Sequence, residues 1–397
     1  MLNKKTIKDI DIKNKRILVR VDFNVPLDQN LSITDPLRIT AALPTIKYLI
    51  ANGAKVILMS HLGRPKGKVI ETLRMRPIYE YLKTNIDFPV FYASDCIGEE
   101  VRQTTDKINP SEILLLENLR FHIGEEKNDP EFVKELVKLG EIYVNDAFGT
   151  AHRAHASTEG IAHYLPSVAG FLVEKEINYL ENTVKNPQRP FVAILGGKKV
   201  SDKLPVIREL MKKVDTILFG GGMVYTFFKA MNKEIGSSIL DEPGINIAKE
   251  IMELAKEQNK TFVFPPDIII ADSFSENANV SVCNIDDGIP DGWQGLDIGP
   301  ISIEKFEKYI NTAKTILWNG PVGVFELKPF SQGSKAIAKK IAANKNLISI
   351  IGGGDTASAV KAFGLADKMS HISTGGGAAL ELLEGKNLPG ISILEDK

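Results

Sequence analysis

The sequence is poor in cysteine and carries almost no net charge. Its 397 residues include two cysteines, Cys96 and Cys283, which lie far apart. Two cysteines cannot build a disulfide framework or, alone, a structural zinc site, so both are predicted to be buried small apolar side chains. The formal net charge of -1 argues against a general attraction to nucleic acid or membrane surfaces. Anions must therefore be bound by local clusters of cations.

Long apolar segments are also missing. No run approaches the roughly 20 residues that a membrane-spanning helix needs. Residues 1–15 are charged and lack the apolar region of a secretory signal. We therefore expect a cytoplasmic chain with neither membrane nor nucleic acid as a partner. The length favours two domains, because a domain usually comprises roughly 100–200 residues.

Several familiar enzyme signatures are absent. The chain has no G-x-x-x-x-G-K-[ST] phosphate loop, no G-x-G-x-x-G opening a βαβ unit, no G-x-S-x-G elbow and no protein-kinase signature. The missing dinucleotide fingerprint disfavours a nicotinamide dehydrogenase. Any nucleotide site must be built from other motifs.

Short apolar, β-rich runs alternate with helix-like stretches along the chain. Most runs are continuous rather than alternating, as expected for strands buried on both faces of a parallel sheet. The predicted strands are residues 16–21, 55–59, 112–116, 141–144, 191–195, 216–219, 261–264, 315–318, 347–351 and 370–372. The helix-like stretches include residues 130–139, 245–257 and 331–343. This alternation predicts an α/β fold with mainly parallel sheets.

A domain boundary is predicted within residues 165–189. Pro166 and Gly170 precede an amphipathic stretch, residues 171–184, and the polar turn 186–190 follows it. One side of this stretch carries Phe171, Leu172, Ile177, Leu180 and Val184. We interpret it as a helix that connects two α/β halves. An ordinary crossover helix within one large domain is the alternative.

Cationic side chains follow successive predicted strands in the first half. Arg64, Arg120 and Arg153 come at three strand ends, and Arg38 and His61 can join them. Ligands of open α/β sheets bind beyond the carboxyl ends of the strands. Arginine offers a planar fork of donors that suits carboxylate and phosphate. The pattern predicts a basic pocket for a small anionic substrate.

Other polar residues accompany this basic pocket. Asp22 and Asn24 follow the first strand and can fix a substrate hydroxyl, which cations alone cannot do. Capping of a turn is the alternative for both residues. His152 and His155 have a spacing that suits a metal, but no carboxylate or cysteine set completes a ligand group. We interpret these two as anion-pocket or structural histidines.

Glycine-rich turns mark the second half. Residues 196–203 follow a strand and open a helix, where backbone amides favour anions, and Lys199 and Lys203 add positive charge. Residues 352–356 repeat this layout, with Asp355 available for Mg²⁺ and Thr356 for phosphate. Residues 374–377 form a third such turn. One glycine triplet usually marks only a tight turn, but their recurrence predicts phosphate binding.

Residues 318–326 add an apolar wall and one carboxylate, Glu326. This combination suits a nucleoside, with the wall against the base and Glu326 near the ribose hydroxyls. Plain core packing is the alternative for the apolar residues.

These segments together resemble the phosphoglycerate kinase family, nearly from end to end. The resemblance is carried by residues 17–26, 60–67, 119–126, 196–203, 318–326, 352–356 and 371–377. It implies Mg²⁺-dependent phosphoryl transfer from 1,3-bisphosphoglycerate to ADP, giving 3-phosphoglycerate and ATP. Another nucleotide-dependent, carboxylate-activating enzyme and a non-catalytic nucleotide-binding protein remain as rival hypotheses.

The resemblance also implies roles for individual residues. The substrate would be held by Asp22, Phe23, Asn24, Arg38, His61, Leu62, Gly63, Arg64, Arg120 and Arg153. The nucleotide would contact Lys203, Gly221, Gly295, Glu326, Gly353, Gly354, Asp355 and Thr356, with Mg²⁺ on Asp355. Catalysis would rest on Arg38, Lys199, Lys203, Gly375 and Gly376. Lys198 and Gln294 depart from the usual pattern of the family, and the extra cation bears on nucleotide affinity.

The implied architecture is two Rossmann-like, three-layer domains joined by a helix hinge. Residues 1–169 would bind phosphoglycerate, 170–185 would form the hinge helix, and 186–378 would bind the nucleotide. Residues 379–397 would form a tail that packs back on the first domain. A monomer that closes about its hinge is expected.

Overall fold

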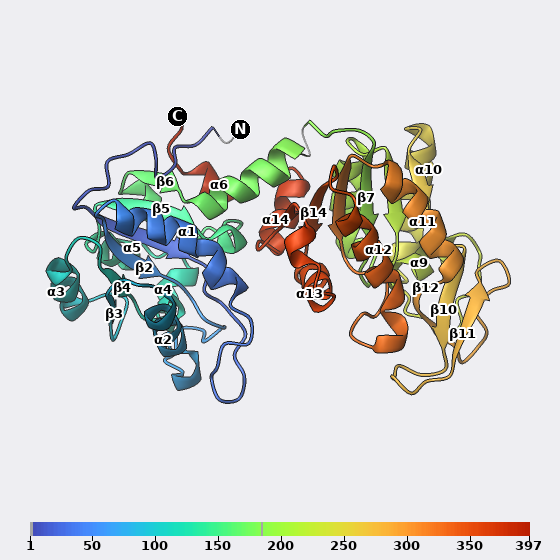
Figure 1. The fold of residues 1–397 in the computed structure, drawn as a ribbon, viewed down its shortest axis with the longest axis horizontal. Helices are drawn as coiled ribbons and strands as arrows, with labels where there is room; N and C mark the ends of the chain where they lie inside the picture. Colours follow the sequence, from blue (N-terminus) through green and yellow to red (C-terminus); the bar gives the residue numbers. More distant parts are fainter. Residues whose placement is uncertain (1–2, 184–185) are drawn as a thin grey trace. The chain divides into compact units, whose positions relative to one another are not determined.

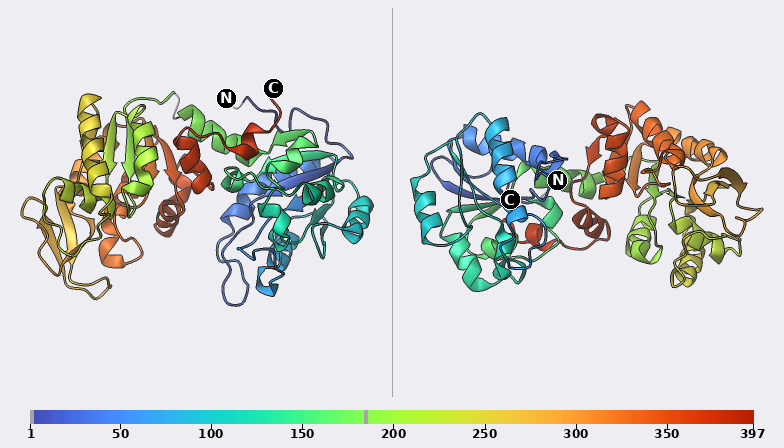
Figure 2. Two further views of the ribbon diagram at one scale, coloured as in Figure 1. Left: turned by 180° about the vertical axis from the view of Figure 1, so that it is seen from behind. Right: turned by 90° about the horizontal axis from the view of Figure 1, so that it is seen from below.

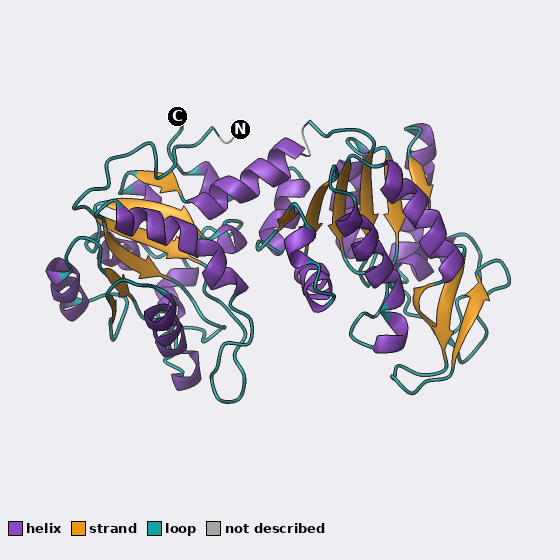
Figure 3. Cartoon of the chain, viewed as in Figure 1, coloured by secondary structure: helices purple, strands orange, loops and turns teal. Residues whose placement is uncertain are grey.

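The computed structural model describes residues 3–183 and 186–397. The chain forms two compact units, one of Met1–Asn178 together with Asn387–Lys397 and the other of Tyr179–Lys386. Each unit is built on a six-stranded parallel sheet with helices packed against it (Figures 1 and 3). The predicted α/β fold with parallel sheets is confirmed. None of the described helices is both long enough and apolar enough to cross a membrane.

The sheet of the first unit has the strand order β3-β4-β2-β1-β5-β6. Its strands are β1 (Arg16–Val21), β2 (Lys55–Met59), β3 (Val90–Tyr92), β4 (Ile113–Leu115), β5 (Ile142–Asp146) and β6 (Ser167–Ala169). The order runs in opposite directions on the two sides of β1, so the gap between β1 and β5 is a topological switch point, where ligands of such sheets bind. The sequence missed β3 and β6, which are three-residue strands at the two edges.

Helices cover the sheet of the first unit because their apolar faces pack on the continuous apolar strands (Figure 2). They are α1 (Leu37–Ala51), α2 (Arg76–Asn85), α3 (Glu99–Lys107), α4 (Ile123–Glu126), α5 (Pro130–Val137) and α6 (Phe171–Ile177). The predicted helix at 130–139 is α5. It begins where the Asp129 side chain accepts hydrogen bonds from the backbone N–H groups of Glu131 and Phe132.

The segment predicted to connect two halves begins as α6 and continues as a π-helical turn, Asn178–Asn182. Three of its predicted apolar residues, Leu172, Ile177 and Leu180, are buried, and the Phe171 ring packs edge-on against Tyr48. Val184 and residue 185, the predicted end of this helix, lie outside the described residues. The first turn of α6 is anchored to the first unit, because Asp146 accepts a hydrogen bond from the Leu172 N–H at 2.8 Å.

The last residues of the chain pack on the first unit. α15 (Pro389–Ser392) lies there, and the Asn145 side chain donates a hydrogen bond to the Gly390 carbonyl at 2.7 Å. Lys5 donates from its backbone N–H to the Glu395 carbonyl at 2.8 Å. Lys4 and Asp396 form an ion pair at 2.9 Å, so the two ends of the chain are neighbours (Figure 1).

The main sheet of the second unit has the strand order β15-β14-β13-β7-β8-β9. Its strands are β7 (Phe191–Leu195), β8 (Thr216–Phe219), β9 (Thr261–Val263), β13 (Thr315–Asn319), β14 (Ile348–Gly352) and β15 (His371–Ile372). All six coincide with predicted strands to within two residues at each end. The switch point here lies between β7 and β13.

A small antiparallel sheet in the second unit was not predicted. It comprises β10 (Asp267–Ala271), β11 (Val280–Asn284) and β12 (Gln294–Ile298) (Figure 3). The helices of the unit are α8 (Leu204–Met211), α9 (Met223–Ala230), α10 (Gly244–Glu257), α11 (Pro300–Thr312), α12 (Gln332–Ala343), α13 (Gly354–Ala362) and α14 (Gly377–Leu383). The predicted helices at 245–257 and 331–343 are α10 and α12.

Candidate functional site

Polar loops gather at the switch point of the first unit. The loop after β1 carries Asp22 and Asn24, and α1 presents Arg38 in its first turn. Arg38 donates from Nη1 to the Asn24 carbonyl at 3.0 Å and pairs with an Asp22 carboxylate oxygen at 3.2 Å. The Asn24 side-chain oxygen accepts a hydrogen bond from the Gly63 N–H at 2.9 Å. The loops after β1 and β2 are therefore held together around one partly exposed arginine.

His61, at the end of β2, is a neutral hydrogen-bond donor in this pocket. Its side chain is 3% exposed, and burial together with four arginines, Arg20, Arg120, Arg38 and Arg153, holds its pKa well below the usual range. Nη2 of Arg20 lies 3.1 Å from Nδ1 of His61. Because an arginine can only donate, Nδ1 accepts and the ring proton resides on Nε2.

Arg120 is a buried cation whose hydrogen-bonding capacity is only partly used. It lies in the short helix Leu119–Phe121 after β4, and its side chain is only 3% exposed. Nη1 donates to the Gly63 carbonyl at 2.9 Å and Nε lies 3.2 Å from a Glu126 carboxylate oxygen, but Nη2 has no partner among the described residues. Burial lowers the pKa of Arg120. Buried polar groups are rarely left unpaired, so the N–H groups of Nη2 indicate a binding site for an anion.

The loop after β5 completes the basic cluster. Arg153 lies in this loop with its Nε 3.1 Å from Nε2 of His152. Burial, helped by Arg120, Arg20 and Arg153, lowers the pKa of His155 to about 4, so this ring is neutral near pH 7. Neither histidine belongs to the one group with metal-like spacing that the described residues contain, Asp95, Cys96 and His122. Their interpretation as anion-pocket or structural histidines stays a prediction.

The side chains of the remaining predicted substrate residues differ in their exposure to solvent. Arg64 is exposed and forms no ion pair with any described residue, so its guanidinium is available. Phe23 and Leu62 are 0% and 2% exposed, and their side chains belong to the core. Their backbone N–H groups are bound to Ser60 and Asn118 side chains. These two residues therefore position the polar neighbours beside them.

A buried network beneath the cluster was missed in the sequence. Arg20 donates from Nε to the Ser157 hydroxyl at 2.7 Å, and that hydroxyl donates to Glu125 at 2.6 Å. Glu125 is fully buried, and this burial raises the pKa of its carboxyl group. The only sequence signal was Arg20 itself, a charged residue inside a strand of apolar ones. Its partners lie too far along the chain to be inferred.

The second unit contains a cavity of ≈ 540 Å³ at its own switch point. Four predicted nucleotide residues line it: Gly221, Gly295, Glu326 and Asp355. Lys198 and Gln294, which depart from the family pattern, line it too. Apolar lining that the sequence analysis missed comes from Tyr225, Ile239, Phe274 and Leu296. A cavity with apolar walls and a few convergent polar groups is suited to a small organic ligand.

Glycines shape this cavity because the backbones approach closely. A Cβ on Gly196 would lie 2.0 Å from the Pro321 carbonyl oxygen, so the loops after β7 and β13 can touch only through glycine. A Cβ on Gly295 would lie 2.2 Å from the Tyr225 hydroxyl. Gly221 adopts φ +65, which other residues rarely do, next to the Gly197 backbone. The predicted glycines thus keep space open and bring loops together.

Polar groups lie around the turns that were predicted to bind phosphate. The Lys203 ammonium donates to the Asn319 side chain, and burial lowers its pKa. Thr356, in the first turn of α13, accepts a hydrogen bond from the Gly320 N–H at 2.7 Å. Asp355 is exposed and makes no hydrogen bond or ion pair with the described residues. Lys203, Gly353, Gly354 and Thr356 are not part of the cavity lining itself.

The other predicted catalytic residues lie outside the cavity lining as well. Lys199 is exposed, near Asp241. The N–H of Gly375 already donates to the Ser373 hydroxyl at 3.1 Å, whereas Gly376 directly precedes α14 with φ +46. An exposed carboxylate such as Asp355 beside a phosphate-sized turn offers the oxygen chemistry that Mg²⁺ prefers, so the residues present fit that ion.

Comparison with known proteins shows similarity to one family over nearly the whole chain. The family model for phosphoglycerate kinase matches residues 7–386. The chain is similar to the structure of phosphoglycerate kinase from Coxiella burnetii, with 40% sequence identity, a TM-score of 0.88, and 98% of each chain covered. It is also similar to phosphoglycerate kinase from Pyrococcus horikoshii OT3, at 30% identity and a TM-score of 0.85, again over 98% of each chain. With its parallel-sheet units and its two polar switch points, the chain belongs to the phosphoglycerate kinase family and is a phosphotransferase.

Proposed function

We propose that this enzyme transfers a phosphoryl group reversibly from 1,3-bisphosphoglycerate to ADP, giving 3-phosphoglycerate and ATP, as a monomer in cytoplasmic glycolysis. The observation that carries the substrate half is Arg120, a buried guanidinium among other cations whose Nη2 has no partner among the described residues. Such a group needs an anion to satisfy it. The ≈ 540 Å³ cavity supports the nucleotide half. Family membership supports the pairing of the two ligands.

The proposed substrate contacts divide by chemistry. The cations Arg38, Arg64, Arg120 and Arg153 would bind phosphate and carboxylate, and His61 would donate from Nε2. Asp22 is already paired with Arg38, and Asn24 already accepts a hydrogen bond from the Gly63 N–H. A substrate hydroxyl that binds Asp22 would therefore share the carboxylate with Arg38. Discrimination for a hydroxylated substrate would then follow from buried polar groups that a different ligand leaves unpaired.

The reaction needs no general base. In the ATP-consuming direction the nucleophile is a carboxylate, which is ionised near pH 7. Phosphoryl transfer then depends on alignment and on neutralising the charge on the equatorial oxygens. We assign this neutralisation to Arg38, Lys199, Lys203 and the amides at Gly375 and Gly376. When bound, Mg²⁺ held by Asp355 would neutralise part of the charge on the nucleotide phosphates.

Domain closure is part of the proposal. The basic cluster belongs to the first unit and the nucleotide cavity to the second, so the transferred group must pass between residues of different units. We propose that the segment 170–185 acts as the hinge and that closure excludes water from the reacting groups. Small-angle scattering should show a smaller radius of gyration with both ligands than with either alone. Identical curves in all three conditions would contradict closure.

The deciding experiment is a coupled assay of ATP and 3-phosphoglycerate consumption with Mg²⁺, comparing the wild type with Arg38→Ala. Loss of one such electrostatic contact typically lowers the rate about 10²–10³-fold. We expect a loss of at least this size in kcat with nucleotide affinity unchanged. Arg76→Ala, which removes an exposed arginine paired with Glu80 on α2, is the matched control and should turn over normally. A folded, nucleotide-binding wild type without turnover would instead favour a binding protein.

A further inference from the structure

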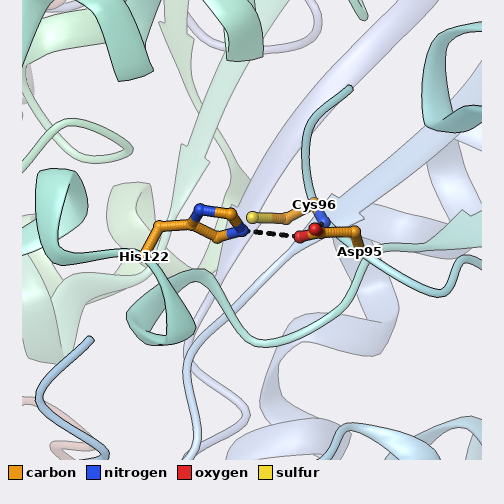
Figure 4. A group of neighbouring side chains, drawn as sticks. All are labelled: Asp95, Cys96 and His122. Atoms are coloured by element: carbon orange, nitrogen blue, oxygen red, sulfur yellow. Dashed lines mark hydrogen bonds and ion pairs between the residues drawn. The ribbon is translucent and has the colours of Figure 1, made fainter. Parts of the chain in front are cut away.

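Three side chains outside both proposed ligand sites bring together a sulfur, a nitrogen and an oxygen (Figure 4). Asp95 and Cys96 lie in the loop between β3 and α3, and His122 lies between the helix Leu119–Phe121 and α4. The Cys96 Sγ, a His122 ring nitrogen and an Asp95 carboxylate oxygen all lie within 4.8 Å of one another. These three atom types are the ones that proteins use to bind zinc.

We propose that Asp95, Cys96 and His122 bind a borderline-soft divalent cation of the Zn²⁺ type, with water in the fourth position. A thiolate favours zinc over the hard ions Mg²⁺ and Ca²⁺, and imidazole suits it equally. Zn²⁺ tolerates three protein ligands when one position remains open. A small contraction of the loop around the ion is needed, because ligand atoms of one tetrahedral ion lie closer together than the present limit of 4.8 Å.

The burial pattern gives the ion a route in. The Asp95 and His122 side chains are 48% and 30% exposed, whereas Cys96 is fully buried behind them. An ion can therefore meet the carboxylate and the ring first and then reach the sulfur. Water remains available on the exposed side for the open position.

Two contacts already orient the ligand groups. Asp95 Oδ1 accepts a hydrogen bond from the Cys96 N–H at 2.6 Å, which restrains the carboxylate. The His122 ring is stacked on Phe132 with centroids 5.3 Å apart. Ligands that are held in place before the ion arrives lose less freedom on binding. Among the described residues this is the one group of its kind.

The present contact between His122 Nε2 and Asp95 Oδ1, at 2.6 Å, is the arrangement without an ion. It is a partly exposed pair, which solvent screens, so its replacement costs little. On binding, the Cys96 thiol loses its proton to the solvent, the His122 proton resides on Nδ1, and Asp95 contributes an ionised oxygen. No atom changes its oxidation state. Binding therefore releases about one proton per ion and weakens as the pH falls.

The test uses Co²⁺ as a spectroscopic substitute for Zn²⁺ on the full-length, metal-free protein. One equivalent of Co²⁺ should produce a thiolate-to-cobalt charge-transfer band in the near ultraviolet, and added Zn²⁺ should abolish it. Excess Mg²⁺ should leave the band in place, because Mg²⁺ does not compete for sulfur. Cys96→Ser should abolish the band, and His122→Gln or Asp95→Asn should weaken Co²⁺ binding at least tenfold.

The matched control is Cys283→Ser, which removes the other cysteine and should keep the band. Thermal unfolding of each variant would show that the fold is retained. The proposal is overturned if no band forms in the wild type, if the band survives in Cys96→Ser, or if Cys283→Ser removes it. It does not depend on the kinase reaction, since none of its residues is assigned to either substrate.

Discussion

Nη2 of Arg20 lies 3.1 Å from Nδ1 of His61, beneath the basic cluster of the first unit. Arginine fixes His61 as the tautomer that carries its proton on Nε2, so the ring can donate to an anion without bearing a charge. Arg20 is itself 1% exposed, so its side chain is not available for contact with a substrate. It acts as a positioning residue.

The first prediction concerns this tautomer. Arg20→Gln should release Nδ1 and mix the two tautomers, which nitrogen NMR of labelled histidine detects. The KM for 3-phosphoglycerate should rise about 10- to 100-fold, because a hydrogen bond to a charged group is worth roughly 1.5–3 kcal/mol. Arg16→Gln changes an arginine at the exposed end of the same strand and should leave both readouts unchanged. An unaltered tautomer in folded Arg20→Gln would disprove the role of Arg20.

The second prediction concerns pH and the first unit. Burial raises the pKa of Asp146 from 3.8 to about 7. An acid whose pKa is raised by folding stabilises the folded state fully at low pH, and this contribution is lost as the pH rises toward 7. It is on the order of 4 kcal/mol at most. Asp146→Asn should therefore flatten the fall in melting temperature between about pH 4 and pH 7.

The comparison variant for this experiment is Asp297→Asn in the second unit. Burial also raises the pKa of Asp297 to about 7. Because the two residues belong to different units, each variant should flatten the transition of its own unit only. The same pH slope in Asp146→Asn and the wild type would show that Asp146 ionises normally.

The third prediction concerns Lys198, an exposed cation on the wall of the nucleotide cavity. It forms no ion pair with the described residues, so its charge is available to phosphates. Lys198→Ala should weaken ATP and ADP binding by about twofold to fivefold, and added salt should narrow the difference, because exposed charge contacts are worth about 0.2–1 kcal/mol. Lys339→Ala removes an exposed lysine of α12 and serves as the control. Titration calorimetry at two salt concentrations would measure these nucleotide affinities. Equal affinities for Lys198→Ala and the wild type would show that the Lys198 charge does not contribute to nucleotide binding.

The fourth prediction contrasts two glycines of the second unit. Gly196→Ala would place a Cβ 2.0 Å from the Pro321 carbonyl, so the backbone must move and we expect a loss of about 1–3 kcal/mol in stability. A Cβ on Gly354 meets nothing within 4 Å, so Gly354→Ala should melt like the wild type. The Gly354→Ala variant should keep its melting temperature but bind nucleotide more weakly, because the turn before α13 is proposed to hold phosphate. Equal melting temperatures for both variants would refute the close-packing argument.

The main sheets were predictable because their strands are continuous apolar runs. The strands β3 and β6 were not, since each contains only one aliphatic β-branched residue: β3 is Val-Phe-Tyr with Phe91 exposed, and β6 is Ser-Val-Ala. In the antiparallel sheet β10–β12, four of the five residues of β11 are exposed, so no apolar run marks that strand. β10 does contain a largely buried apolar run, residues 268–271, which the sequence analysis passed over. A hydrophobic pattern marks buried strands, and it does not mark a strand such as β11 that is exposed to water.

The site was predictable where residues follow strand ends, and unpredictable where pairing spans the chain. Arg38, His61 and Arg120 could be placed in one pocket because parallel strands end at one edge of a sheet. Arg20 and Ser157, in contrast, meet across 137 positions. A hydrogen bond between residues so far apart in the sequence depends on the complete fold, so no local sequence pattern predicts it.

The return of Asn387–Lys397 to the first unit has a consequence for biosynthesis. The second unit is one uninterrupted stretch and has all of its residues as soon as Lys386 has been made. The first unit begins earlier but receives residues 387–397 as packing partners only after the second unit has been made. During translation the unit that starts second is therefore the first that can be completed. The Ser167 carbonyl of the edge strand β6 accepts a hydrogen bond from the Glu395 N–H, so this contact forms only after Glu395 has been made.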